Sequence, residues 1–215
     1  MTNKILDNIK EKYKLTEIEV NEFSSFKAKG MKFNIKAYYA EGFGHISIMS
    51  AVAFFGLMKM DTVIIVPKER DLPLYSYDRI YAMGNDTLIV ELYDTMVNKC
   101  DLSFLDMIKE KFKSLAERDP GTHWYDYMKL SSSISKKGKK KLSKEFDLLS
   151  LEHFKAYLNT NTVELKDKTK KLELSKEYVF GLLSHGGPST DVFIKMFGRE
   201  KTEKLYKTIL FGLEL

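Results

Sequence analysis

Cysteine, membrane-length apolar runs and glycine-rich phosphate loops are what this sequence lacks. Cysteine occurs once, as Cys100, which excludes a disulfide within the chain and a Cys-rich metal or iron–sulfur site. No apolar run is long enough to span a membrane, and Met1-Thr2-Asn3-Lys4 does not begin a signal peptide. No loop of the kind that holds a dinucleotide is present. We therefore expect a cytoplasmic protein with no membrane partner, no Cys-rich metal or iron–sulfur site and no dinucleotide-binding fold.

Arginine is also scarce. Of the 35 basic residues only four are Arg, namely Arg70, Arg79, Arg118 and Arg199. Proteins that read nucleic acids usually rely on Arg side chains, so a nucleic-acid-binding domain is the weakest interpretation of this sequence. The chain nevertheless carries a net charge of +5. A surface dominated by Lys favours attraction to an acidic partner.

The chain begins with mostly strand patterns and continues with helix patterns. Its 215 residues suit one domain over 1–215, which we expect to be monomeric. Strand patterns occupy five successive segments, 31–39, 45–54, 62–66, 77–83 and 87–93. Tight turns join them, which predicts an antiparallel meander. Residues 17–26 fit either a strand or a loop.

Helical spacing of apolar residues predicts a short helix over 2–13 and several helices after residue 94. The later helices are expected to begin at Ser103, Ser150, Ser175, Ser189 and near Arg199. Residues 131–144 are polar and rich in Lys. They are either a solvated loop or part of a docking face.

An acidic residue interrupts an apolar strand face in the predicted hairpin of 77–83 and 87–93. Side chains two residues apart share a face of a strand, so Asp78 lies beside Ile80 and Ala82. Buried Asp is rare unless it is paired or functional. Two interpretations stay open on the residues alone: Asp78 is a functional acid, or it lies at a sheet edge where it binds water or caps a turn.

Two blocks of sequence carry a resemblance to a known family. The first is PKERDLPLYSYDRIYAMGNDTLIVELYDT, residues 67–95, and the second is VFIKMFGREKTEKLYKTILFGL, residues 192–213. Both resemble the ferredoxin-dependent bilin reductases, of the phycocyanobilin:ferredoxin oxidoreductase type. The first block follows the family's Leu-Pro-Leu/Ile-Phe-Gly-x-Asp pattern, with Tyr75 in place of Phe and Ser76 in place of Gly. The second resembles the family's closing two helices.

The resemblance implies an α/β fold, a three-layer α/β/α sandwich with a central antiparallel sheet. It implies reduction of a bilin such as biliverdin by single electrons from reduced ferredoxin, with no metal or flavin. Asp78 aligns with the family's proton donor to the bilin. The residues expected to bind the substrate are His45, Ser47, Met49, Ser76, Trp124 and Phe193. For Trp124, a packed core position is the more common alternative.

The sequence departs from the family at several proton-relay positions. Ser47 and Met49 stand where the family has His and Glu, and Thr62 stands near a place where some members have His. Gly186 and Gly187 replace a second Asp. His185 beside them can titrate near neutrality, which makes it a second catalytic candidate. The alternative is that His185 merely ends a surface helix.

The missing relay groups motivate a competing function. A protein that keeps the fold but lacks proton donors can bind a tetrapyrrole without reducing it. Spectral binding without turnover in the presence of reduced ferredoxin would identify such a carrier.

Overall fold

The computed structural model describes residues 1–28, 30–187 and 189–214. Its centre is an eight-stranded antiparallel sheet in the order β1-β3-β4-β5-β6-β7-β8, with β2 also paired to β3. The strands are β1 (Leu15–Ile18), β2 (Ser25–Ala28), β3 (Met31–Ala40), β4 (Gly44–Ala53), β5 (Met58–Pro67), β6 (Leu74–Ala82), β7 (Asn85–Tyr93) and β8 (Ile134–Lys139). The predicted five-strand meander is therefore confirmed as β3 to β7.

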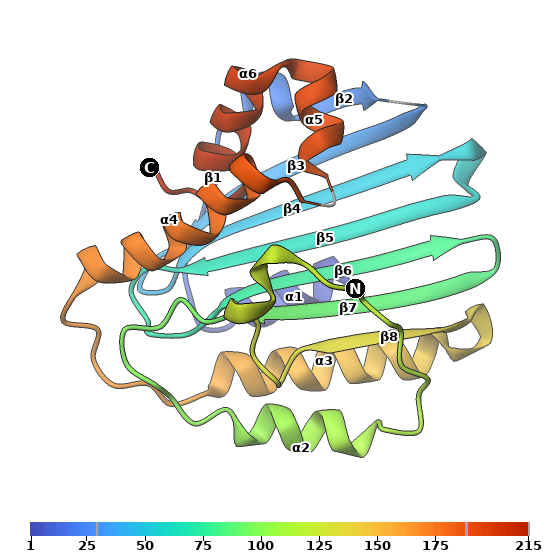
Figure 1. Cartoon of the computed structure of the whole chain (residues 1–215). Helices are drawn as coiled ribbons and strands as arrows, with labels where there is room; N and C mark the ends of the chain where they lie inside the picture. The colour runs from blue at the N-terminus through green and yellow to red at the C-terminus, as the bar shows by residue number, and fades with distance from the viewer. Residues whose placement is uncertain (29, 188, 215) are drawn as a thin grey trace.

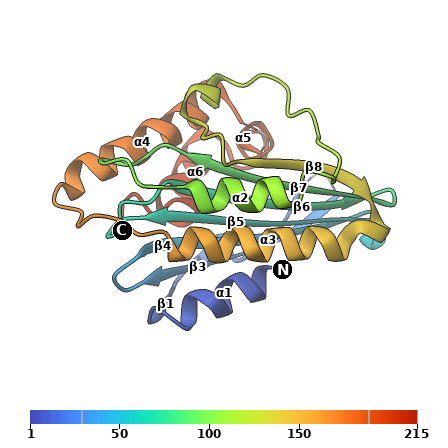
Figure 2. The same cartoon turned by 90° about the horizontal axis from the view of Figure 1, so that it is seen from below.

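Helices cover both faces of this sheet, which gives three layers (Figures 1 and 2). We call the face under the C-terminal helices the front and the opposite one the back. The back helices are α1 (Thr2–Lys10), α2 (Ser103–Lys111) and α3 (Ser143–Asn159). The front helices are α4 (Lys168–His185), α5 (Thr190–Phe197) and α6 (Arg199–Lys204). The predicted α/β/α sandwich with a central antiparallel sheet is confirmed.

Each face of the sheet carries its own hydrophobic core, because alternate residues of a strand point to opposite faces. On β4, Met49 and Ala51 lie in the front core, whereas Ile46 lies in the back core. On β6, Leu74 faces the front, and Tyr75 and Tyr77 face the back. No helix in the described ranges has both the length and the apolarity needed to cross a membrane.

The Lys-rich segment 131–144 is not simply a loop, because it contains β8, which pairs with β7. The strand was not predicted because most of its residues are polar or charged. Lys136 is buried, and its ammonium donates to the Leu115 carbonyl at 2.9 Å and to the Glu117 carboxylate at 2.5 Å. These two acceptors compensate the burial of the charge. Lys137 and Lys139 of the same strand are exposed.

Two predicted helix starts are wrong. α3 begins at Ser143 rather than Ser150, and α4 begins at Lys168 rather than Ser175. The first turn of α4 is rich in Lys, so its apolar pattern starts later than the helix. In α3, by contrast, the apolar pattern already begins at Phe146 and Leu149, so the predicted start was simply placed too late. α4 does have a side-chain cap, because the Lys170 amide donates to the Asp167 carboxylate at 2.8 Å.

The predicted last helix, near 199–213, divides into two parts. α6 continues into a π-helical segment, Leu205–Leu210, and the chain then turns at Gly212 with a φ of +60°. A side chain at Gly212 would collide with the His45 ring, since a Cβ atom there would lie 2.3 Å from it. The C-terminal segment therefore lies directly against β4.

Candidate functional site

The front face is open over strands β6 and β7. Back-facing residues of these strands, such as Tyr77 and Val90, are fully buried. Their front-facing neighbours are only half-buried, and they are Ser76, Asp78, Ile80, Thr87, Ile89 and Glu91. We call these six residues the open face. Because a ligand needs accessible surface with a few polar groups, the open face is the candidate site.

Asp78 is the acid of the open face. It lies opposite Thr62 of β5 on one side and Ile89 of β7 on the other. The Thr62 hydroxyl donates a hydrogen bond of 2.5 Å to Asp78 Oδ1. Desolvation raises the pKa of Asp78 from 3.8 to about 6, which the bond from Thr62 opposes and the charge of Glu91 supports. A carboxyl with this pKa is partly protonated near neutrality and can donate a proton.

Glu91 is the second carboxylate of the open face and pairs in register with Ser76. The Tyr93 hydroxyl donates to Glu91 Oε2 at 2.6 Å, and Lys129 Nζ lies 3.9 Å from Oε1. The negative charge of Glu91 contributes to the raised pKa of the neighbouring Asp78. The two carboxyls therefore have different environments, which suits one of them to proton donation.

Trp124 packs against α4, where its ring lies near that of Tyr178. Its indole Nε1 donates to the Gly186 carbonyl at 2.9 Å. Gly181 makes room for the ring, because a Cβ atom there would lie 2.1 Å from Trp124 Cη2. Trp124 also packs edge-on against Tyr125, with ring centroids 5.3 Å apart. The half-buried indole is therefore held in place on two sides.

His185 is the last residue of α4 and is exposed. Its ring centroid lies 5.5 Å from that of Trp124. Gly186 follows with a φ of +85° and a ψ of 167°, a backbone conformation that is open to glycine and ends the helix. This placement fits a helix terminator, and the catalytic role of His185 stays a prediction.

His45 and Ser47 lie beneath the C-terminal segment and outside the open face. His45 Nε2 is 2.7 Å from the Ile209 carbonyl, and the Ser47 hydroxyl donates to the Leu210 carbonyl at 2.8 Å. Both side chains are buried. Burial lowers the pKa of His45 to about 4, so its ring is neutral and donates through Nε2. Contact with a substrate, as predicted, would require the C-terminal segment to move.

The other predicted binding residues differ in accessibility. Met49 and Phe193 are buried in the front core, and Phe193 packs edge-on against Phe33 and Phe26. Ser76 belongs to the open face. Of the predicted set, the structure therefore brings Asp78 and Ser76 together on accessible surface, whereas Trp124 is half-buried against α4.

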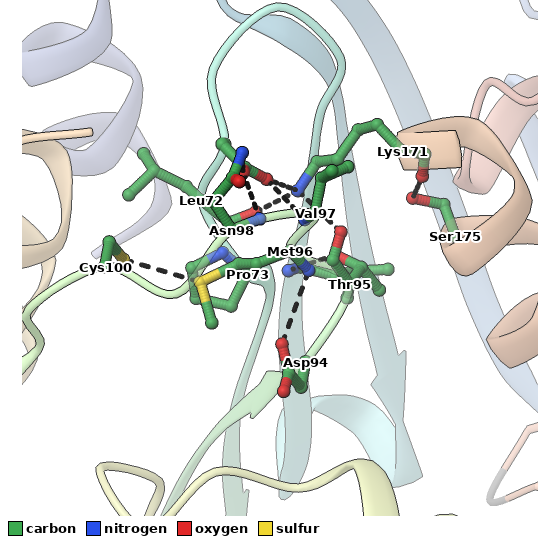
Figure 3. Close-up of polar contacts among 12 residues, drawn as sticks. Leu72, Pro73, Asp94, Thr95, Met96, Val97, Asn98, Cys100, Lys171 and Ser175 are labelled. Carbon is green, nitrogen blue, oxygen red and sulfur yellow. Dashed lines mark hydrogen bonds and ion pairs between the residues drawn. The ribbon is translucent and has the colours of Figure 1, made fainter. Parts of the chain in front are cut away.

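A buried ion pair fixes α4 to the start of β6 (Figure 3). Lys171 Nζ donates to the carbonyls of Leu72 and Thr95, the latter at 2.9 Å, and lies 3.6 Å from Asp71 Oδ1. Asp71 in turn accepts from the amides of Val97 and Asn98 at 2.9 and 2.7 Å. Desolvation lowers the pKa of Lys171 to about 8, although Asp71 opposes this shift. The pair holds the front helix at a fixed position beside the site.

Thr62 and Glu91 are the site residues that the sequence analysis missed as partners of Asp78. Each reaches Asp78 through strand register and not through any local motif. Among the described residues, no three His, Cys, Asp or Glu side chains form a group that could hold a metal ion. The site therefore offers a proton donor on a surface that combines apolar and polar side chains.

Comparison with known proteins finds a similar fold but does not assign the chain to a family. No family model matches the sequence, and no curated protein matches it. The fold is similar to the crystal structure of phytochromobilin synthase from tomato in complex with biliverdin, with a TM-score of 0.76. The match covers 99% of this chain and 82% of that chain, at 12% sequence identity.

Proposed function

We propose that this protein reduces a bilin such as biliverdin, taking electrons from reduced ferredoxin and a proton from Asp78. The observation that supports the proposal is Asp78 itself, a half-buried acid on the open face with a pKa raised to about 6. The similarity in fold to a phytochromobilin synthase crystallised with biliverdin supports the choice of substrate class. The open face would receive one side of the tetrapyrrole.

The proposed reaction adds two electrons and two protons across one double bond of the bilin. Two reduced ferredoxins each supply one electron, and each is oxidised by one electron. Asp78 supplies one proton and is reprotonated from solvent, and water supplies the other. Burial of the acid matters because a carboxyl that is fully ionised at neutral pH has no proton to give.

Attraction between the basic protein and an acidic electron donor supports the choice of ferredoxin. The net charge of +5 steers an acidic partner towards the protein. Salt screens such steering, since the Debye length falls to roughly 8 Å at physiological ionic strength. Reduction rates measured by stopped flow are therefore expected to fall as salt rises, while bilin binding changes little.

The second candidate is a tetrapyrrole-binding protein without redox turnover. It is favoured by the state of His45 and Ser47, because both donate to C-terminal carbonyls and have no free polar hydrogen for a substrate. Under this function the open face would still bind the pigment.

One experiment separates the two functions. Biliverdin is mixed with the protein, binding is followed by the absorption spectrum, and reduced ferredoxin is then added. Reduction by the wild type, with normal binding but about 100-fold or greater loss of turnover in Asp78→Asn, would support the enzyme. Asp61→Asn is the matched control, because Asp61 is a half-buried Asp next to Thr62 on β5 and points to the opposite face.

Binding without reduction by the wild type would establish the carrier. Wild-type turnover in Asp78→Asn would contradict the role of Asp78. An unchanged spectrum with biliverdin would contradict both functions.

A further inference from the structure

Three turns of the chain meet at one end of the sheet, far from the C-terminal segment (Figure 1). They are the β4–β5 turn around Phe54–Gly56, the β6–β7 turn at Met83 and Gly84, and the segment Lys140–Leu142 before α3. A cavity of about 480 Å³ lies between them, lined among others by Leu57, Tyr81 and Lys140. The three turns therefore form one continuous surface, which we call the turn surface.

Large apolar side chains extend into solvent from the turn surface. Phe55 is fully exposed, and the exposed fractions are 68% for Phe54, 75% for Leu57 and 91% for Met83. A single exposed apolar residue needs no explanation, but a cluster of four on adjoining turns marks an interaction site.

The backbone at these turns is unfavourable for the residues that occupy it. Phe54, Phe55 and Met83 have φ values of +49°, +53° and +50°. This left-handed region suits Gly or Asn in a hairpin turn and is strained for bulky residues. Because the side chains are exposed, packing within the protein does not compensate the strain. A role outside the folded chain accounts for their presence.

Positive charge surrounds these apolar residues. In the stretch 137–145 five Lys are exposed, against one exposed acid, Glu145; they are Lys137, Lys139, Lys140, Lys141 and Lys144. Lys59 is also exposed and lines the same cavity. The turn surface, with apolar side chains and lysines around them, is complementary to a partner that has negative charge on its surface and an apolar interior.

We propose that the turn surface docks on an anionic lipid membrane. Phe54, Phe55, Leu57 and Met83 enter the boundary between headgroups and acyl chains, and the lysines bind lipid phosphates. A bilayer is favoured over a protein partner because the apolar side chains extend into solvent with most of their surface exposed, and a bilayer accepts them without a matching pocket. The proposal departs from the expectation of no membrane partner, which rested on the lack of a membrane-length apolar run. Surface binding requires no membrane-spanning helix, so it is compatible with the absence of one among the described helices.

Sedimentation with vesicles tests the proposal. One set of vesicles contains equal parts of phosphatidylcholine and phosphatidylglycerol, and the other contains phosphatidylcholine alone. The full chain is expected to sediment with the first set and to remain in solution with the second. The double substitution Phe54→Asn and Phe55→Gly is expected to weaken binding about tenfold or more, because it removes the inserted groups. Asn and Gly suit the turn conformation, so the variant is expected to fold.

Two further variants sharpen the result. Phe104→Ser is the matched control, since Phe104 is 66% exposed on α2 at another place on the surface; it is expected to bind as the wild type does. Changing Lys139, Lys140 and Lys141 to Glu is expected to weaken binding roughly 100-fold or more, from the loss of phosphate attraction.

Several outcomes would overturn the proposal. They are no sedimentation with anionic vesicles, equal sedimentation with both vesicle sets, or unchanged binding in the double Phe variant. Self-association in gel filtration that the double Phe variant abolishes would assign the turn surface to a second copy. Slower reduction by ferredoxin in that variant, without vesicles, would assign it to the electron donor. The last result concerns partner docking and leaves the role of Asp78 to its own test.

Discussion

Two acids on opposite faces of strands β6 and β7, Asp86 and Asp78, are held in different ways. On the back face Asp86 receives two bonds from Arg79, at 2.5 and 2.6 Å, and a third from the Ser143 hydroxyl at 2.6 Å. On the front face Asp78 receives one bond among the described residues, from Thr62. The same two strands therefore carry a carboxylate with three bonds behind and one with a single bond in front. The first stabilises the fold, and the second is available for chemistry.

Breaking the back-face ion pair of Arg79 and Asp86 should cause the largest change, a loss of stability. Asp86→Ala leaves the buried Arg79 guanidinium without its partner, and removal of one member of a buried pair costs about 3–5 kcal/mol. The free energy of unfolding from urea titration measures this loss. Asp61→Asn, on the same face of the sheet but half-buried, is expected to cost about 1 kcal/mol or less. A similar small loss in Asp86→Ala would mean that the ion pair does not stabilise the fold.

Replacing the front-face acid, Asp78, should raise the free energy of unfolding at neutral pH, whereas breaking the back-face pair lowers it. The pKa of Asp78 is about 6 in the folded protein against an ordinary value of 3.8, so ionisation opposes folding. Wild-type stability is then lost as pH rises from below 3.8 to above 6, by at most about 3 kcal/mol. Asp78→Asn should therefore be more stable than the wild type at pH 7, with a difference that shrinks towards pH 4.

Urea titrations of both proteins across this pH range measure the difference. An Asn variant that is less stable than the wild type at pH 7 would show that the ionised carboxyl is well compensated. The same variant is expected to lose turnover, so stability and activity change in opposite directions at this position.

Removing the hydrogen bond from Thr62 should have a smaller effect, which acts on the pKa of Asp78. Thr62→Val removes the hydroxyl that favours the ionised form of Asp78, so the pKa of Asp78 should rise further. Activity that depends on protonated Asp78 would then persist to higher pH, by up to about one unit. The pH profile of bilin reduction measures the shift. Glu91→Gln should move the profile the other way, because it removes the neighbouring negative charge.

The smallest effect is expected at His185. Its side chain is exposed at the end of α4, and Ser47, Met49 and Thr62 supply no imidazole or carboxyl as a further proton donor. Under the proposed function we therefore expect the wild type to stop after a two-electron reduction. Product analysis by chromatography should give the same product from His185→Gln. A four-electron product from the wild type that disappears in His185→Gln would identify His185 as a second proton donor.

The fold was predictable where a strand has a clear apolar pattern. β3 alternates between buried and exposed residues, and β5 carries a continuous apolar run at 63–66. The helix order after residue 94 is also as expected. β8 was not recognised, since its Lys136 is buried through bonds to Leu115 and Glu117, which the strand's own sequence does not reveal. β1 and β2 have four residues each, too few for a periodic pattern to emerge.

The candidate site was predictable only in its central acid. Asp78 is conspicuous because the next residues on its strand face, Ile80 and Ala82, are apolar. Thr62 lies 16 residues away and becomes its partner through the register of β5 and β6, which no local motif encodes. The engagement of His45 and Ser47 by the C-terminal segment depends on residues more than 160 positions later. Such contacts follow from tertiary structure and not from spacing.

The bonds from β4 to the C-terminal segment also set an order for folding during synthesis. His45 pairs with a carbonyl 164 residues later in the chain. On the ribosome the nascent chain can complete the back layer once α3 has emerged, whereas the front layer must wait for the last segment. Until then β4 presents unpaired polar groups and an uncovered apolar surface, the state in which a nascent chain is most prone to aggregate. Chaperone dependence during translation should therefore be concentrated in the time between the emergence of α3 and that of Leu210.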